Sequence, residues 1–188
     1  MSADAAITAG SPGSARRSEL LALAYDYVLE RGLAGLSLRP LAAATGTSPR
    51  VLLYLFGSKD GLVRELLARA RAEQLTQVRA SLENTEIHDV GDVVWRVLAA
   101  PERRRLVRLI YEAFIMSVQP APGPWEGFAT EQVNDWLALL KAAQPGTTTR
   151  QAEARATRAL AMIRGLLLDL LATDDNDRIA RALAQQRM

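Results

Sequence analysis

The chain has 188 residues and a formal net charge of +2, with 49% hydrophobic and 23% charged residues. This composition is that of an ordinary globular protein and excludes a disordered chain. There is no cysteine and only one histidine, His88, which excludes disulfides and zinc ribbons and argues against a multi-histidine metal site. The nearly balanced charge gives by itself no indication of a nucleic-acid partner.

The first residues do not have the pattern of a secretion signal. Residues 1–14 are small and polar, with glycine and proline among them, and they are predicted to form a flexible tail. The most apolar stretch, Leu166 to Leu171, is interrupted by Asp169 and is too short to cross a bilayer. We therefore expect a soluble, cytoplasmic protein.

The first helix is predicted from Ser18 to Arg31. Gly32 follows at the position where a left-handed C-cap is common. One face of this helix is apolar at the spacing expected for helical residues, and its members are Leu20, Leu23, Ala24, Tyr27 and Val28.

Two short helices are predicted next. Ser37 is placed to N-cap a helix of about two turns, and Ser48 with Pro49 is a typical start for another. Gly46 lies in the short turn between them. Together with the first helix, this pattern is typical of a helix-turn-helix, although short helices joined by a glycine turn also occur in plain helical bundles.

In a helix-turn-helix, the second short helix enters the major groove with its N-terminal residues at the base edges. Arg50 is the candidate base reader, since a guanidinium can bind guanine O6 and N7 together. An exposed arginine is also often only a solvated charge. Tyr54 is a candidate phosphate donor, as are Ser37 and Lys59. The predicted DNA-binding residues are Ser37, Ser48, Pro49, Arg50, Val51, Leu53, Tyr54 and Lys59.

The segment from Leu20 to Leu67 resembles the DNA-binding domain of the TetR family of bacterial transcriptional regulators. The resemblance lies in A-Y-D-Y-V-L-E-R-G-L (24–33), L-S-L-R-P-L-A-A-A-T-G-T-S (36–48) and L-L-Y-L-F-G-S-K-D-G-L (52–62). It implies that Tyr54 and Lys59 hold phosphates and that residues 48–51 face the major groove. Leu53 and Leu55 stand where the family usually has Tyr or His, and Pro49-Arg50 replaces a commoner Lys-Gly type of pair.

The rest of the chain is predicted to be helical. The expected helices span 59–81, 90–98, 101–118, 125–143, 148–172 and 178–186, with breaks at 83–89, 120–124, 145–146 and 173–177. The predicted fold class is all-α, with about nine helices. It has an N-terminal three-helix helix-turn-helix domain and a C-terminal helical domain for ligand binding and dimerisation. The expected domains are the tail (1–14), the DNA-binding domain (15–62) and the effector-binding and dimerisation domain (63–188).

Residues 163–171 are apolar on nearly every side of their helix, apart from Arg164, Gly165 and Asp169. Such a helix must be covered on all sides, by a second copy of the chain or by the chain's own core. The resemblance favours the second copy, because it implies a four-helix interface built from the last two helices. The predicted homodimer interface comprises Ile163, Leu166, Leu167, Leu170, Leu171, Ile179 and Leu183.

Large apolar side chains in the C-terminal two thirds suggest a pocket for a small hydrophobic effector, although such residues are more often ordinary core. The resemblance implies that an inducer shifts the fourth helix and spreads the two DNA-binding domains. The candidate pocket residues are Trp95, Tyr111, Phe114, Met116, Trp125, Phe128, Trp136 and Met162.

No phosphate loop or metal-ligand spacing is found, and Glu112 and Asp169 are isolated acids, so we expect neither an enzyme nor a bound metal or cofactor. The predicted function is that of a TetR-like regulator and, by the family's habit, a repressor. It would bind a palindromic double-stranded operator as a homodimer and be released by a small-molecule effector. The alternative is a helical protein-interaction adaptor that does not bind DNA.

Overall fold

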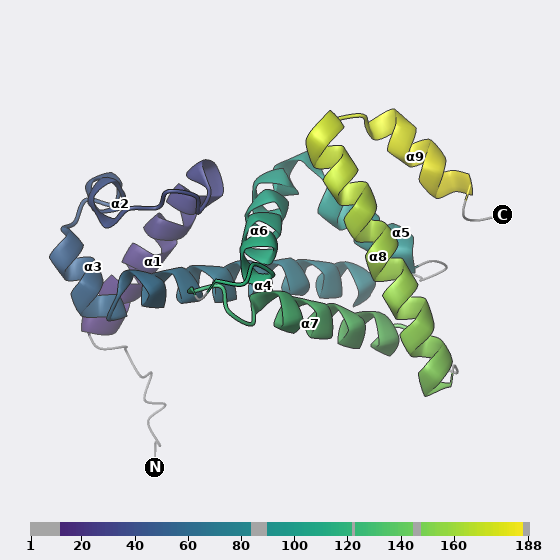
Figure 1. Ribbon diagram of the computed structural model, residues 1–188, viewed down its shortest axis with the longest axis horizontal. Coiled ribbons are helices and arrows are strands. Elements are labelled where there is room, and N and C mark those ends of the chain that lie inside the picture. The colour runs from purple at the N-terminus through teal and green to yellow at the C-terminus, as the bar shows by residue number, and fades with distance from the viewer. Residues whose placement is uncertain (1–11, 84–89, 122, 145–147, 186–188) are drawn as a thin grey trace, which may run out of the picture. The chain divides into compact units, whose positions relative to one another are not determined.

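The structure is a computed structural model that describes residues 12–83, 90–121, 123–144 and 148–185 (Figure 1). This part of the chain is all-helical, which confirms the predicted fold class. Its elements are α1 (Pro12–Arg31), α2 (Leu38–Ala44), α3 (Pro49–Phe56), α4 (Lys59–Glu83), α5 (Val90–Ala99), a 3-10 helix η1 (Pro101–Arg103), α6 (Arg104–Ser117), α7 (Phe128–Ala142), α8 (Thr149–Thr173) and α9 (Asn176–Gln185).

The chain divides into two compact units, Met1–Leu66 and Leu67–Met188. Helix α4 contributes its first residues to one unit and the rest to the other. Among the residues described, no helix is both long enough and apolar enough to cross a membrane.

Helix α1 begins at Pro12, six residues before the predicted start at Ser18. Residues 12–14, expected in the tail, are therefore helical, and residues 1–11 lie outside the described part of the chain. The early turns have no apolar periodicity, and the contacts seen in them are polar. Arg16 pairs with Glu19 at 2.7 Å, and Arg17 contacts α3 and α4.

The buried face of α1 differs from the predicted one. Leu20, Ala24 and Val28 are fully buried as expected, but Tyr25 is buried in place of Leu23, which is 40% exposed. Tyr27 is only half-buried. This helix has apolar residues on more than one side, so spacing alone does not determine which of two adjacent stripes meets the core.

Helices α2 and α3 form the predicted helix-turn-helix. They pack on each other through buried residues that include Leu41 of α2 and Leu52 of α3. Thr45 is also buried, and its hydroxyl donates to the backbone oxygen of Leu41 at 2.9 Å. The turn passes through Gly46 at φ +63, a left-handed conformation that glycine adopts readily.

The second unit has one hydrophobic core, to which α4, α5, α6, α7 and α8 all contribute. Helix α8 packs on α5, α7 and α9, and α6 packs on α7 (Figure 1). The buried members of this core are Leu75, Val78, Val94, Leu98, Val107, Trp136, Leu139, Leu140, Ala156, Leu160, Ile163 and Leu167.

Most helix ends in this unit lie within a few residues of the predicted ones. Helix α7 begins at Phe128 and not at Trp125, because a turn through Gly127 at φ +78 precedes it. Helix α6 is preceded by the 3-10 turn that starts at Pro101. Of the break predicted at 83–89, Glu83 is the last residue of α4 and residues 84–89 lie outside the described residues, as do residue 122 of the break at 120–124 and the break at 145–146.

Candidate nucleic-acid interface and ligand cavity

Helix α3 presents one face to the core of its unit and the opposite face to solvent. Leu52 and Phe56 are 1% and 7% exposed, whereas Leu53 is 42% exposed and Tyr54 is 86% exposed. Val51, at 37%, is also exposed. Short helices are not stable alone, so this amphipathic packing is what holds α3 in place with a free outer surface.

The start of α3 is well defined. The Ser48 hydroxyl accepts a hydrogen bond from the backbone N–H of Val51 at 3.3 Å, and Pro49 occupies the first helical position. Arg50 follows and is exposed. Such a helix start presents backbone N–H groups and a positive dipole end, which favour a negatively charged partner.

The remaining predicted DNA-binding residues, Ser37 and Lys59, are also exposed in this unit. Ser37 precedes α2 without capping it through its side chain, so its hydroxyl has no part in the helix start. Lys59 begins α4 after Ser58, whose hydroxyl accepts from the N–H of Gly61 at 2.9 Å. Within the residues described, neither Arg50 nor Lys59 takes part in an ion pair.

Arg17 holds the end of α3, a contact that sequence reasoning missed. Its Nε donates to the backbone oxygen of Leu55 at 3.2 Å, its Nη2 pairs with Glu65, and its guanidinium lies 5.2 Å from the centre of the Phe56 ring. The last carbonyls of a helix lack partners within the helix, so a guanidinium there satisfies an otherwise open acceptor. No sequence spacing relates residue 17 to residue 55.

The second unit contains a small, partly open interior cavity of about 20 Å³, which has room for about one water molecule. Three of the eight predicted pocket residues, Tyr111, Phe114 and Trp136, line it. The other five do not; they are Trp95, Met116, Trp125, Phe128 and Met162. Trp95 instead packs against the core, and Phe128 is buried elsewhere.

The polar residues of this cavity were not predicted. Gln74 of α4 and Gln132 of α7 are each 3% exposed, and the Gln132 Nε2 donates to the Gln74 Oε1 at 2.7 Å. Arg164 of α8 also lines the cavity. Glutamine and arginine are usually surface residues, so a sequence search based on apolar side chains passes over them.

Two side-chain atoms at this cavity are buried and, among the described residues, have no hydrogen-bond partner: Gln132 Oε1 and Arg164 Nη2. The Arg164 guanidinium lies 4.7 Å from the centre of the Phe114 ring, and the Tyr111 hydroxyl donates to the Arg164 backbone oxygen at 3.0 Å. Each unpaired buried group costs about 1–3 kcal/mol of stability.

Burial also affects the titration of this site. It raises the pKa of Tyr111 well above its usual value, an effect that the nearby Arg164 opposes. Burial lowers the pKa of Arg164, and Tyr111 opposes that shift. Both shifts have the same cause, because a low-dielectric environment disfavours whichever form is charged.

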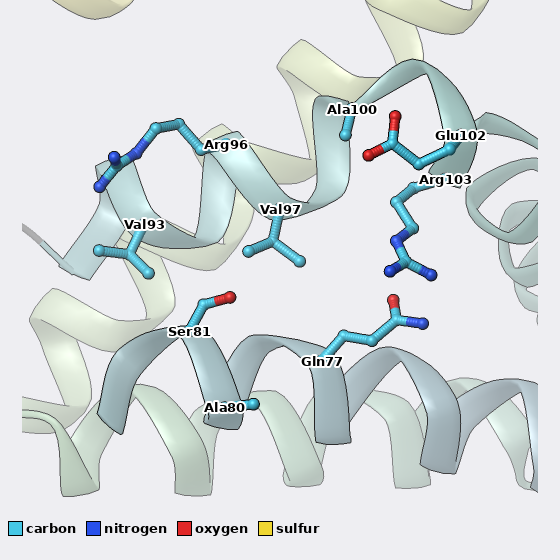
Figure 2. Close-up of a pocket in the computed structure, with 9 residues that line it drawn as sticks. All are labelled: Gln77, Ala80, Ser81, Val93, Arg96, Val97, Ala100, Glu102 and Arg103. Carbon is cyan, nitrogen blue, oxygen red and sulfur yellow. The ribbon is translucent and has the colours of Figure 1, made fainter. Parts of the chain in front are cut away.

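A larger hollow of about 600 Å³ is an open groove between α4 and α5 (Figure 2). Gln77 and Ser81 of α4 lie opposite Val97 of α5, and the Arg103 guanidinium points towards Gln77 (Figure 2). The Gln77 Nε2 donates to Glu73 at 2.9 Å, and Arg103 lies 3.7 Å from the same carboxylate oxygen. The groove is therefore polar along one wall and lacks the enclosure typical of a small-molecule site.

The predicted dimer residues fall into two groups. Ile163, Leu167, Leu170 and Ile179 are at most 3% exposed within the single chain. Leu166, Leu171 and Leu183 are half-buried. The first group already packs inside the chain and offers almost no area to a second copy. Sequence periodicity could not separate these groups, because the helix is apolar on both its inner and outer sides.

The outward face of α8 contains small and apolar residues. Leu168 is 46% exposed, and a Cβ added at Gly165 would meet no atom within 4 Å. The exposed members of this stripe, spaced by seven, four, three and four residues, are Ala154, Ala161, Gly165, Leu168 and Ala172. This spacing places them along one side of the helix.

The comparisons with known proteins agree with the geometry. Residues 20–66 match the family model described as bacterial regulatory proteins, tetR family. No curated protein matches the sequence at a significant level. The family model covers α1 from Leu20 onward, α2, α3 and the start of α4 as far as Leu66, which is nearly the segment that carries the resemblance.

Solved structures match over most of the chain. The multidrug binding protein EbrR, in complex with imidazole, is 28% identical over 93% of this chain and 90% of its own, with a TM-score of 0.66. Its complex with ethidium is 26% identical over 90% of this chain and 96% of its own, with a TM-score of 0.66. A TetR-family transcriptional regulator from Cytophaga hutchinsonii has a TM-score of 0.78 at 15% identity, and the match covers 95% of this chain and 94% of that one.

The resemblance to the TetR family is therefore confirmed. The chain has the TetR-like fold, with an N-terminal helix-turn-helix segment that matches the family model and a C-terminal helical domain. The matched family model and the Cytophaga hutchinsonii structure are both those of transcriptional regulators.

Proposed function

We propose that the protein is a transcriptional repressor that binds a palindromic DNA operator as a homodimer and leaves it when a small molecule binds the second unit. The observation that supports DNA binding most strongly is the free outer face of α3. It combines a capped N-terminus, an exposed Arg50 outside any ion pair of the described residues, and an 86% exposed Tyr54. A large aromatic residue this exposed has little stabilising role in the unit itself.

In this proposal each exposed residue has one role. Arg50 reads a guanine edge in the major groove, and Val51 and Leu53 make apolar contacts there. Tyr54, Lys59 and Ser37 donate to phosphates, which fix the position of the helix on the duplex. Ser48 and Pro49 present the helix start to the DNA backbone. We expect the DNA-binding domain over residues 15–62 and the regulatory domain from residue 63, whereas the two compact units divide four residues later, after Leu66.

We place the homodimer contact on the outward face of α8. The small residues around Gly165 allow two helices to approach closely, and Leu168 gives the contact an apolar centre. The half-buried Leu166, Leu171 and Leu183 would complete it. A twofold axis there pairs two DNA-binding domains, so that they can read half-sites about 34–36 Å apart on one face of the duplex.

The effector would bind in the interior cavity and act through α4. Gln74 of α4 lines this cavity, while Leu62, Val63 and Leu66 of the same helix are buried in the first unit. A ligand that favours one position of α4 therefore shifts the population of DNA-binding conformations. The complexes of EbrR with ethidium and imidazole support a small-molecule ligand for this fold.

The DNA-binding proposal is tested by titrating the protein onto duplex DNA from just upstream of its own gene and onto a scrambled duplex, at two salt concentrations. We expect tighter binding to the upstream duplex, with an affinity that falls steeply as salt rises. Tyr54→Ala should weaken binding to both duplexes, whereas Leu23→Ala, which changes an exposed residue on α1, should not. Absence of binding at low salt would favour the helical adaptor.

A further inference from the structure

The interior cavity combines apolar walls with two polar atoms that lack partners. Gln132 Oε1 and Arg164 Nη2 are both buried and, among the described residues, neither is hydrogen-bonded. Gln132 is only 3% exposed, and both residues line the same cavity. Buried polar groups in proteins are nearly always paired, so two unpaired groups on one cavity indicate that something else completes them.

The charged side chain that lines this cavity is positive. Arg164 provides a guanidinium, and the lining residues, all within the described part of the chain, include no Asp or Glu. Phe114 covers one face of the guanidinium, and the Tyr111 hydroxyl is already donating to a backbone oxygen. A cation entering this cavity would meet repulsion, whereas a carboxylate would receive the free N–H of Arg164 in a charge-assisted hydrogen bond.

The other walls determine the body of the ligand. Aromatic rings of Phe114, Tyr111 and Trp136 lie around the cavity, with aliphatic side chains between them. Such walls favour a flat, apolar group. The free acceptor at Gln132 favours a hydroxyl or amino group on the ligand in addition to the carboxylate.

We propose, resting on the role of this cavity as the effector site, that the effector is a small aromatic carboxylic acid. Its carboxylate pairs with Arg164, its ring lies among the aromatic side chains, and a donor group on the ring meets Gln132 Oε1. The cavity of about 20 Å³ is too small for such a ring, so binding requires the surrounding side chains to move apart. This movement couples ligand binding in the cavity to a conformational change of the second unit.

The test uses the full chain without DNA and three probes: benzoate, 4-hydroxybenzoate and benzamidine. They share one ring but differ in charge and donor group. Calorimetric titration should show binding of the two acids, tighter for 4-hydroxybenzoate, and no binding of the benzamidine cation. Equal binding of benzamidine, or no binding of either acid at millimolar concentration, would overturn the proposal; the second result would leave a water molecule as the occupant.

Variants separate the two polar contacts. Arg164→Met should weaken both acids between about tenfold and a hundredfold, and Arg164→Lys should retain part of the affinity. Gln132→Leu should remove the advantage of 4-hydroxybenzoate and leave benzoate binding unchanged. Arg158→Met, on an exposed part of the same helix, is the control. Unaltered acid binding by Arg164→Met would also overturn the proposal.

The ligand proposal and the DNA-binding proposal can be disproved separately. Selective DNA binding by a protein that binds no acid would remove the effector class and keep the DNA-binding role. Acid binding by a protein that shows no selective DNA binding would remove the regulatory role and keep the ligand class.

Discussion

The Nε of Arg17 on α1 donates a hydrogen bond to the backbone oxygen of Leu55, 3.2 Å away near the end of α3. The same guanidinium pairs with Glu65 of α4 and lies over the ring of Phe56. One side chain therefore connects three helices of the first unit. It fixes the C-terminal end of the helix whose outer face we assign to DNA.

Arg17→Met should lower the free energy of unfolding by about 1–2 kcal/mol, since it removes the hydrogen bond to Leu55 and the pairing with Glu65. It should also weaken binding to all DNA sequences alike, because α3 is less firmly positioned. Denaturant unfolding measures the first effect. Arg16→Met is the matched control, and its exposed pair with Glu19 predicts a change within about 0.5 kcal/mol. Equal stability of the two variants would show that Arg17 has no anchoring role.

The sequence was sufficient to predict the helices and the helix-turn-helix, because caps such as Ser48-Pro49 and the turn at Gly46 are local signals. It could not predict the early start of α1, which depends on Arg17 meeting residues far along the chain. It also assigned Ile163 and Leu167 to a dimer contact, although they line the chain's own cavity. The cavity's polar residues, Gln132 among them, have no local pattern at all.

Arg50→Ala should relax discrimination at particular base pairs by about 1–3 kcal/mol, because it removes a bidentate contact to guanine. Binding to single-base variants of the operator, measured by competition, checks this. Arg39→Ala, at an exposed arginine of α2, is a suitable comparison. If Arg50→Ala keeps the full sequence preference, Arg50 does not read bases.

Lys59→Ala should weaken binding to every sequence by a similar factor. If Lys59 neutralises one phosphate in each half-site, the slope of log affinity against log salt should become flatter by about one unit per half-site. The measurement is a salt titration of wild type and variant on the same duplex. A change in base preference without a change in slope would contradict the phosphate assignment.

Leu168→Glu should convert the dimer into monomers in sedimentation experiments while the helical content is retained, since Leu168 is 46% exposed in the single chain. Leu23→Glu, at 40% exposure on α1, should leave the dimer intact. Leu170→Glu should instead unfold the chain, because Leu170 is 2% exposed and a charge would have to be buried there. A persistent dimer of Leu168→Glu would place the interface elsewhere.

The pKa of Tyr111 is raised on folding, so the native state favours the neutral phenol. The stabilisation that Tyr111 gives over phenylalanine should be fully present below its unfolded pKa of about 10 and should decrease as the pH rises above it. The difference in unfolding free energy between wild type and Tyr111→Phe, measured from pH 7 to pH 11, checks this. A difference that grows with rising pH would contradict the burial argument.

The most direct test of the DNA-binding account is selection of binding sites from a library of random duplexes, followed by sequencing of the bound fraction. The account predicts an enriched inverted repeat with half-site centres about 10 base pairs apart, and loss of the preferred bases when Arg50→Ala is used in the selection. A bound fraction without any enriched sequence, for a protein that sediments as a folded dimer, would contradict it.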